Sequence, residues 1–452
     1  MMGSILAIMF MMDEKSFDQF HANKDRLFRL NKVFVEDDKS TTLQAESSGL
    51  MGPTMVDEFP EVEATVRFHP WYEEVLLSNE EKTLITGEAD LAFADSTFFQ
   101  VFDFKLLRGD PRKVLTRPST IVITEQVAKS LFGNQDPIGK TFIGIGGLPF
   151  EVTGIAEEPP RNSHIQFTGL ISWTTTVPQL GPGRLQFEWM NNWIAQGIRT
   201  YILVKPDADV KGLQSKFEKF MQAHMPTRWE KYKLYLQPFT EIYLKSTDVK
   251  YGNIAKSGSQ EFLNLFSIIA AFVLFIACIN YINISTSKAT RRSREVGMRK
   301  TMGARKSQLI TQFLGESFLV TLISAMLGLL LVYLMIPFFN DLAGKSLPLN
   351  LLLNSTVIIG IFVLIFTVSV ISGIYPSFVI SSFSPAEVLR AAGKSRISGN
   401  WPRYILITFQ FAVSIVMIAG TLLVYQQIKF VLSKDLGLPK STSWSSGLRT
   451  MW

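Results

Sequence analysis

The sequence predicts two fold classes in one chain: an α-helical transmembrane domain with four full spans and a partial N-terminal one, and an α+β domain outside the cytoplasm. Three observations lead to this prediction. Long uncharged stretches lie within residues 262–426, mixed strand and helix patterns fill residues 13–260, and basic residues gather in alternate connections between the uncharged stretches. About 20 consecutive apolar residues are enough for a helix to cross the hydrocarbon core of a bilayer.

The first full span is predicted at 262–284, where 23 residues carry no charge. The residues that follow, 285–307, contain eight basic side chains and a single acid, Glu295. Cytoplasmic connections carry an excess of Lys and Arg close to the membrane. We therefore expect this span to run from outside to inside, with the basic segment in the cytosol.

Three further spans are predicted at 318–339, 357–375 and 404–425. The connection 340–354 carries only Asp341 and Lys345, which indicates an outward position. The connection 381–403 carries four basic residues against one acid, which indicates an inward position. The two basic connections thus alternate correctly with the spans.

The N-terminal segment 1–12 is apolar from Gly3 onward, but ten residues are too few to span a membrane. It lacks the basic start and the cleavage site of a signal peptide. We expect it to be the second half of a transmembrane helix, with a short buried helix as the alternative. The Ser/Thr-rich tail within 426–452 shows no regular pattern, and we expect it to be a truncated end outside the membrane.

Residues 13–260 alternate between strand and helix patterns, which predicts a mixed α+β domain. Strands are predicted at 27–35, 121–124, 150–156 and 200–205. Thr124 suits the N-cap of a helix over 125–132 that ends at Gly133. Residues 207–225 place their apolar side chains on one helical face.

Composition and motifs exclude several functions. The net charge of +6 comes largely from membrane-flanking connections, so we predict no nucleic-acid partner. The segment 133–141 resembles a phosphate-binding loop, but five residues separate its glycines and Pro137 removes an amide, so we predict a turn. The four histidines lack metal-ligand spacing, and the single cysteine, Cys278, is predicted to pack within a span. We therefore predict no catalytic, cofactor or metal site.

The basic segment 291–306 is the informative motif, since positive-inside topology explains its charges but not its glycines. A helix here would place Glu295 four residues from both Arg291 and Arg299, and Gly303 would end it. Such a short basic helix, joined directly to two spans, can carry a push from a cytosolic partner. The candidate coupling residues are Arg291, Arg294, Glu295, Gly297, Arg299, Lys300 and Gly303.

Residues 294–304 (REVGMRKTMGA) resemble the signature of the FtsX-like permeases, the membrane subunits of ABC systems of the macrolide-exporter (MacB) and lipoprotein-release type. The flanking residues 276–283 and 312–317 fit the same family, as do 384–390. Segments 17–21, 98–102, 121–142 and 237–243 resemble its large periplasmic domain. The resemblance covers about residues 13–430.

The resemblance implies a non-catalytic, multi-pass subunit of the bacterial inner membrane that exports macrolides or antimicrobial peptides, or releases lipoproteins. It implies a periplasmic core domain at 13–260, an FtsX-like permease domain at 261–390, a cytosolic linker at 391–403 and a helix at 404–425 that opens a missing second unit.

The implied partners are an ABC ATPase that binds the ATP, the lipid bilayer, and a second permease half or a second copy of the chain. Within the spans, Asn280, Asn283 and Glu316 are candidates for coupling between helices; solvation near helix ends explains them equally well. Two other functions stay open from the residues alone: a membrane-anchored ligand sensor and a membrane-tethered enzyme.

Overall fold

The computed structural model describes residues 1–452 except 37, 72–76, 79–83, 86–89, 146–147, 177–187, 194–196, 228, 253–256, 346, 383–400 and 434–452. The chain forms two compact units. We call Phe10–Leu265 the β-rich unit, and Met1–Met9 together with Phe266–Trp452 the helical unit. The chain passes between the units within its first and seventh α-helices.

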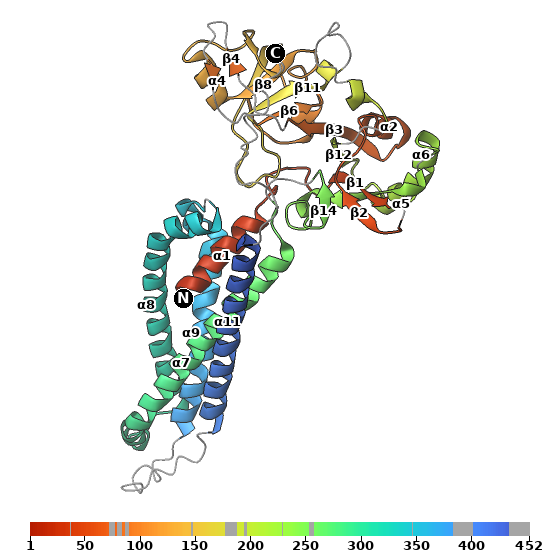
Figure 1. Cartoon of the computed structure of the whole chain (residues 1–452). Coiled ribbons are helices and arrows are strands. Elements are labelled where there is room, and N and C mark those ends of the chain that lie inside the picture. The colour runs from red at the N-terminus through yellow and green to blue at the C-terminus, as the bar shows by residue number, and fades with distance from the viewer. Residues whose placement is uncertain are drawn as a thin grey trace. The chain divides into compact units, whose positions relative to one another are not determined.

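A 14-stranded mixed sheet organises the β-rich unit (Figure 1). Its strands are β1 (Leu27–Val35), β2 (Thr41–Gln44), β3 (Val62–Pro70), β4 (Leu77–Ser78), β5 (Leu84–Ile85), β6 (Leu91–Ala94), β7 (Leu106–Arg108), β8 (Thr120–Thr124), β9 (Thr141–Ile143), β10 (Pro149–Ala156), β11 (Gly169–Ser172), β12 (Arg199–Val204), β13 (Tyr232–Pro238) and β14 (Val249–Tyr251). The strand order is β14-β2-β1-β12-β3-β6-β11-β8-β10-β9-β4-β5, with β13 on β1 and β7 on β10. Strands distant in sequence are therefore neighbours.

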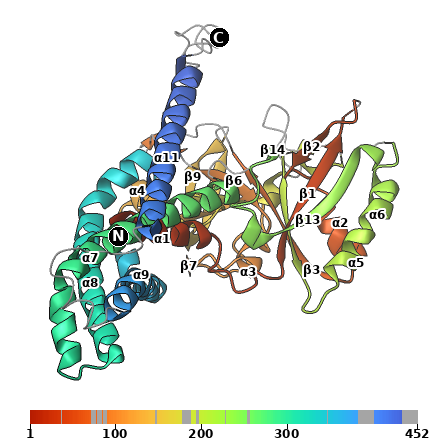
Figure 2. The ribbon, with the colours of Figure 1, turned by 90° about the horizontal axis from the view of Figure 1, so that it is seen from below.

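Short helices cover this sheet. They are α2 (Met51–Glu58), α3 (Phe98–Val101), α4 (Glu125–Phe132), α5 (Val210–Ser215) and α6 (Phe217–His224), with 3-10 turns at Trp173–Thr176, Glu188–Asn191, Trp229–Lys231 and Phe239–Glu241. Figure 2 shows α2, α5 and α6 beside β1, β3 and β13. Apolar side chains such as Met55, Phe217 and Phe220 pack there against Leu30 and Ile202. Their burial is the main source of stability for such short helices.

Local sequence signals predicted several of these elements correctly. The predicted strand at 27–35 and helix at 125–132 have the bounds of β1 and α4. Thr124 occupies the N-cap position, as predicted, and its side chain makes no capping hydrogen bond. The segment 133–140 is a turn before β9, as predicted. The predicted helix over 207–225 is divided into α5 and α6 at Lys216.

The helical unit contains four helices that are long and apolar enough to cross a membrane among the described residues. They are α7 (Gln260–Thr301), α8 (Lys306–Ala343), α9 (Ser355–Ser382) and α11 (Trp401–Ser433), with a 3-10 turn at Leu349–Leu353. Each contains one predicted span. Together with the mixed sheet they confirm the predicted fold class.

The N-terminal helix α1 (Met2–Lys15) contributes its first residues to this unit. A Cβ added at Gly328 of α8 would lie 3.2 Å from the Cβ of Met1, and one added at Gly360 of α9 would lie 3.5 Å from Ile8 Cγ2. Glycines permit this close approach of helix backbones. α8 also packs along α9 and contains Pro337.

Some predicted segments fall outside the described residues. They are most of the linker at 391–403, the motif at 384–390 and the tail from 434 onward.

Candidate functional site

The predicted coupling segment forms the connection between α7 and α8. The structure corrects its form, because the segment is not a separate helix over 291–306. α7 continues without interruption from its apolar part to Thr301, since no proline stands between Ser285 and Thr301. Gly303 has a φ of +97°, a conformation that only glycine adopts easily, and it ends the helix. Residues 302–305 then turn into α8.

A chain of polar contacts joins the two helices near this turn. Glu295 accepts a hydrogen bond from Arg299 at 2.6 Å, the predicted i,i+4 pair. Arg299 also donates to Gln312 Oε1 of α8 at 2.9 Å, and Gln312 donates to Glu316 at 3.3 Å. Glu316 is half-buried. The arrangement fixes the position of one helix against the other.

An apolar contact lies beside this chain. Val296 of α7 and Leu309 of α8 are buried against each other, with Phe313 packed on them. At the turn, Arg305 N donates to Gln308 Oε1 at 2.9 Å in a capping box that starts α8. Val296, Leu309 and Gln312 were not among the predicted coupling residues. The available signal was the i,i+3 spacing of Val296 from Arg299 and the i,i+4 spacings of Leu309 from Phe313 and of Gln312 from Glu316.

The remaining predicted coupling residues lie on the same element. Arg291, Arg294, Gly297 and Lys300 all belong to α7; the side chains of Arg291 and Arg294 are outside the described part of the structure. Asn280 is exposed and Asn283 half-buried. Next to Asn280, a hydrogen bond of 3.1 Å joins the hydroxyls of Tyr281 in α7 and Ser317 in α8. Whether these residues couple the helices functionally stays a prediction.

In the β-rich unit, Tyr243 holds both segments that continue into the helical unit. Its hydroxyl donates to Glu14 Oε1 of α1 at 3.1 Å, and its ring stacks on Phe17. Its carbonyl accepts from Gly258 N at 3.0 Å, just before α7 begins. Gln260 N, the first residue of α7, donates to the carbonyl of Leu244 at 3.0 Å. We call this arrangement the Tyr243 clamp.

A buried polar network lies directly after α1. Asp18 Oδ2 contacts His164 Nδ1 at 2.7 Å, and His164 Nε2 contacts the hydroxyl of Tyr201 at 2.9 Å. Asp18 Oδ1 also accepts from Ser163 Oγ and from His164 N, both at 3.0 Å. Burial opposes ionisation of Asp18, but the charge and hydrogen bonds of His164 outweigh it, so the pKa of Asp18 lies below its usual value.

His21 adds a second histidine to this region. Asp103 N donates to its Nδ1 at 3.0 Å, and the rings of Phe20, Phe104 and Phe239 surround it. Burial lowers the pKa of His21 to about 4, although the charges of Asp18 and Asp103 oppose the shift. Sequence spacing gave no sign of the cluster, because 146 positions separate Asp18 from His164.

The line Asp18–His164–Tyr201 has the geometry of an orienting acid, a base and a hydroxyl. The side chains of Asp18 and His164 are only 1% exposed, and Tyr201 belongs to the main core cluster. Substrate could not reach a hydroxyl in this position. The network therefore anchors the end of α1 to β12 and to the loop before β11.

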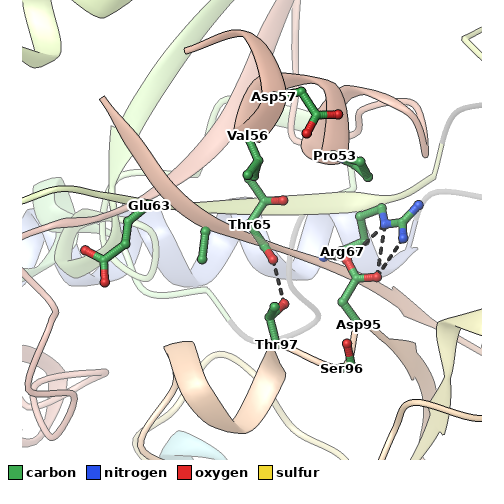
Figure 3. Close-up of a pocket in the computed structure, with 10 residues that line it drawn as sticks. Pro53, Val56, Asp57, Glu63, Thr65, Arg67, Asp95, Ser96 and Thr97 are labelled. Atoms are coloured by element: carbon green, nitrogen blue, oxygen red, sulfur yellow. Dashed lines mark hydrogen bonds and ion pairs between the residues drawn. The ribbon is translucent and has the colours of Figure 1, made fainter. Parts of the chain in front are cut away.

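A pocket of about 320 Å³ opens beside α2 and β3 (Figure 3). Pro53 and Val56 form its apolar wall. On its floor, Arg67 makes a two-pronged contact with Asp95 at 2.7 and 2.9 Å, and its guanidinium lies 4.4 Å from the Trp173 ring. The polar groups of the floor thus satisfy one another.

Fold and site together define a class of protein. The chain has the features of a polytopic membrane protein with a basic turn between two apolar helices and a folded α/β domain. Residues 267–385 match the FtsX-like permease C-terminal family, and residues 1–220 match the MacB-like periplasmic core domain. These two matches confirm the resemblance to the FtsX-like, MacB-type permeases that was found in the sequence.

The individual proteins that resemble this chain share less than 30% sequence identity with it. The chain is 28% identical over 295 residues to the macrolide export ATP-binding/permease protein MacB of Shewanella sp. (strain W3-18-1), covering 65% of this chain and 42% of the relative. It is 25% identical over 308 residues to MacB of Pasteurella multocida, covering 67% and 43%. The chain therefore spans less than half the length of these relatives.

Among solved structures, a domain of a putative permease protein from Porphyromonas gingivalis is similar, with 21% identity and a TM-score of 0.40 over 48% of this chain and 93% of that one. The periplasmic region of MacB from Actinobacillus actinomycetemcomitans matches with 16% identity and a TM-score of 0.32, over 47% and 90%.

Proposed function

We propose that this chain is the permease subunit of an ABC transporter and that it transmits motion from a separate ATPase to its own periplasmic domain. The Tyr243 clamp carries this proposal. Through Glu14, Gly258 and Leu244, one short segment holds the end of α1 and the start of α7. A displacement of either helix is therefore passed to the β-rich unit and is not lost in a free loop.

The α7–α8 hairpin supports the other half of the proposal. Its basic turn is held by the contacts of Arg299 with Glu295 and Gln312 and by the apolar pair Val296 and Leu309. A hairpin fixed in this way moves as one piece when a partner pushes on it. ATP binding and hydrolysis belong in this proposal to the partner chain, and this chain has no catalytic role.

The direct experiment is purification of the tagged full chain from its native membranes into nanodiscs, with mass spectrometry and an ATP hydrolysis assay. We expect an ATP-binding chain to accompany it in stoichiometric amount. Glu295→Lys reverses the only acidic charge of residues 285–307 and should lower stimulated ATP turnover. The proposal fails if no ATP-hydrolysing chain is present, or if the variant is stimulated normally.

Orientation is tested separately, in a chain whose Cys278 is replaced by alanine. A cysteine at Ser307, in the hairpin, should resist membrane-impermeant thiol reagents in intact cells. A cysteine at Lys219, exposed on α6, should react once the outer membrane is permeabilised. The reverse pattern would place the β-rich unit in the cytosol.

The pocket beside α2 favours a second function, a membrane-anchored ligand sensor. Two of its lining residues, Val56 and Asp57, are exposed to solvent, as a recognition surface requires. Protection of residues 53–67 from hydrogen exchange by a periplasmic extract, without any ATP-hydrolysing partner, would favour the sensor over the transporter.

A further inference from the structure

Two methionines at the tip of the α7–α8 hairpin are unusually exposed. Met302 exposes 85% of its surface and Met298 exposes 55%. Met302 N donates to the carbonyl of Met298 at 3.1 Å, so the two residues follow each other on one helical face. A contiguous apolar pair exposed beyond the spans requires an explanation, because single exposed apolar residues are common and paired ones at a helix tip are less so.

The lipid bilayer does not provide that explanation. The apolar part of α7 ends at Ser285, and Met298 lies thirteen residues further along the same helix. At 1.5 Å per residue this is about 20 Å. The headgroup layer on one side of a bilayer is only about 5–7 Å thick. The pair therefore stands well beyond the membrane surface when α7 crosses it.

The surroundings of the pair are cationic. Arg299, Lys300, Arg305 and Lys306 flank it, and the only acid nearby, Glu295, is neutralised by Arg299. Methionine and arginine are both enriched at the centres of protein interfaces, and methionine adapts its shape to irregular grooves. A surface complementary to the pair and its basic neighbours would have an apolar floor and an acidic rim, as a groove on a protein can have.

The hairpin also presents the pair in a fixed position. The buried contact of Val296 with Leu309 lies one turn away, and the capping box of Arg305 and Gln308 starts α8 on the other side. Preorganisation of this kind reduces the entropy lost on binding.

We propose that Met298 and Met302 are the anchor residues with which the hairpin enters an apolar, acid-rimmed groove of the ATPase partner. This inference rests on the proposed function, and it names the contact that the function requires. The basic side chains orient the approach, and burial of the two thioether side chains holds the complex.

The test measures binding of the purified partner ATPase to the full chain in nanodiscs by biolayer interferometry. Replacing both residues by glutamine keeps length and helix propensity but removes apolar surface, and the double variant should raise Kd at least tenfold. Met298→Leu with Met302→Leu should stay within threefold of wild type. Ser307→Ala, an exposed position on the same hairpin, serves as the matched control and should change nothing.

Hydrogen exchange at residues 295–313 checks that each variant keeps the hairpin. A glutamine pair that binds as tightly as wild type, with the hairpin intact, overturns the inference and leaves the proposed function standing. Absence of binding by the wild-type chain defeats the proposed function itself. Protection of Met298 and Met302 by anionic nanodiscs without any ATPase would assign the pair to lipid and also overturn the inference.

Discussion

The two units of this chain differ in where they place polar and apolar side chains. In the β-rich unit, Arg29 is fully buried, and it donates to Gln237 and Ser246 at 2.8 and 2.9 Å. In the helical unit, Leu334 and Phe366 expose 60% and 65% of their surfaces. This difference indicates that the distribution of side chains in each unit is adapted to a different solvent. Water demands an apolar core with satisfied polar groups, whereas lipid accepts apolar side chains on the outside.

The substitution with the largest expected effect removes a buried polar contact of the β-rich unit. Asp18→Ala removes the carboxylate that holds His164 and Ser163, and it leaves the amide and the Nδ1 of His164 buried without this acceptor. Breaking a buried pair in this way costs about 3–5 kcal/mol. Hydrogen exchange of β8 and β12 amides in the full chain should report the loss. Asp25→Ala, an exposed change seven positions away, should stay within about 0.5 kcal/mol.

The second prediction concerns the exposed apolar side chains of the helical unit. Phe366→Arg places a charge in the middle of the apolar part of α9, at a cost of about 2.5–3.5 kcal/mol for insertion. The inserted fraction, measured by alkaline extraction of membranes, should fall sharply. Phe366→Leu is the control and should insert normally. Leu107→Arg, a similar change at a half-exposed position of the β-rich unit, should be nearly silent; equal damage by both arginines would contradict the comparison.

The third prediction concerns pH. The pKa of His21 is lowered from 6.5 to about 4. Between these two pH values the His21 side chain is therefore protonated in the unfolded β-rich unit but neutral in the folded one. Stability should therefore fall as the pH drops from about 6.5 to 4, by at most about 1.4 kcal/mol per pH unit. Asp18 adds a further loss below its ordinary pKa of 3.8, because its folded pKa is lower still.

His21→Phe isolates the histidine contribution in that experiment. The variant should flatten the decline between pH 6.5 and 4, and it should keep the loss at lower pH that Asp18 causes. A smaller slope remains from His69, whose pKa burial also lowers. An unchanged slope would show that His21 is protonated in the folded unit.

The smallest effect sharpens the contrast between buried and exposed pairs. Glu295→Gln removes the ion pair with Arg299, both of whose side chains are about half exposed. Such i,i+4 pairs contribute about 0.3–0.5 kcal/mol. Hydrogen exchange across 295–301 should rise only slightly, and 0.5 M salt should erase the difference between variant and wild type. A loss comparable to that of Asp18→Ala would refute the contrast.

Local signals in the sequence were sufficient for single elements. A fully uncharged run predicted the apolar part of α7, and the residues between Thr124 and Gly133 predicted α4. The division of α5 from α6 at Lys216 escaped prediction, because Leu213, Phe217 and Phe220 fall on one face whether or not the helix is continuous. Periodicity reports the buried face and not the integrity of the backbone.

The contacts that define the candidate site lie beyond such signals. Tyr243 meets Glu14 across 229 positions, and His164 meets Tyr201 and Asp18 only because β12 lies between β1 and β3 in the sheet. The hairpin residues Arg299 and Gln312 are 13 positions apart on separate helices. Pairings of this kind depend on strand order and helix packing, which no local pattern encodes.

Pro337 gives α8 a different mechanical character from α7. A proline within a helix lacks the amide that would bond to the carbonyl four residues earlier, here that of Tyr333, and its ring crowds that turn. α7 contains no proline over its 42 residues. Under axial load α7 resists bending, whereas α8 can bend more easily at Pro337, which lies six residues before its C-terminal end at Ala343. A force applied at the turn between the two helices is therefore transmitted along α7, whereas in α8 it causes bending at Pro337.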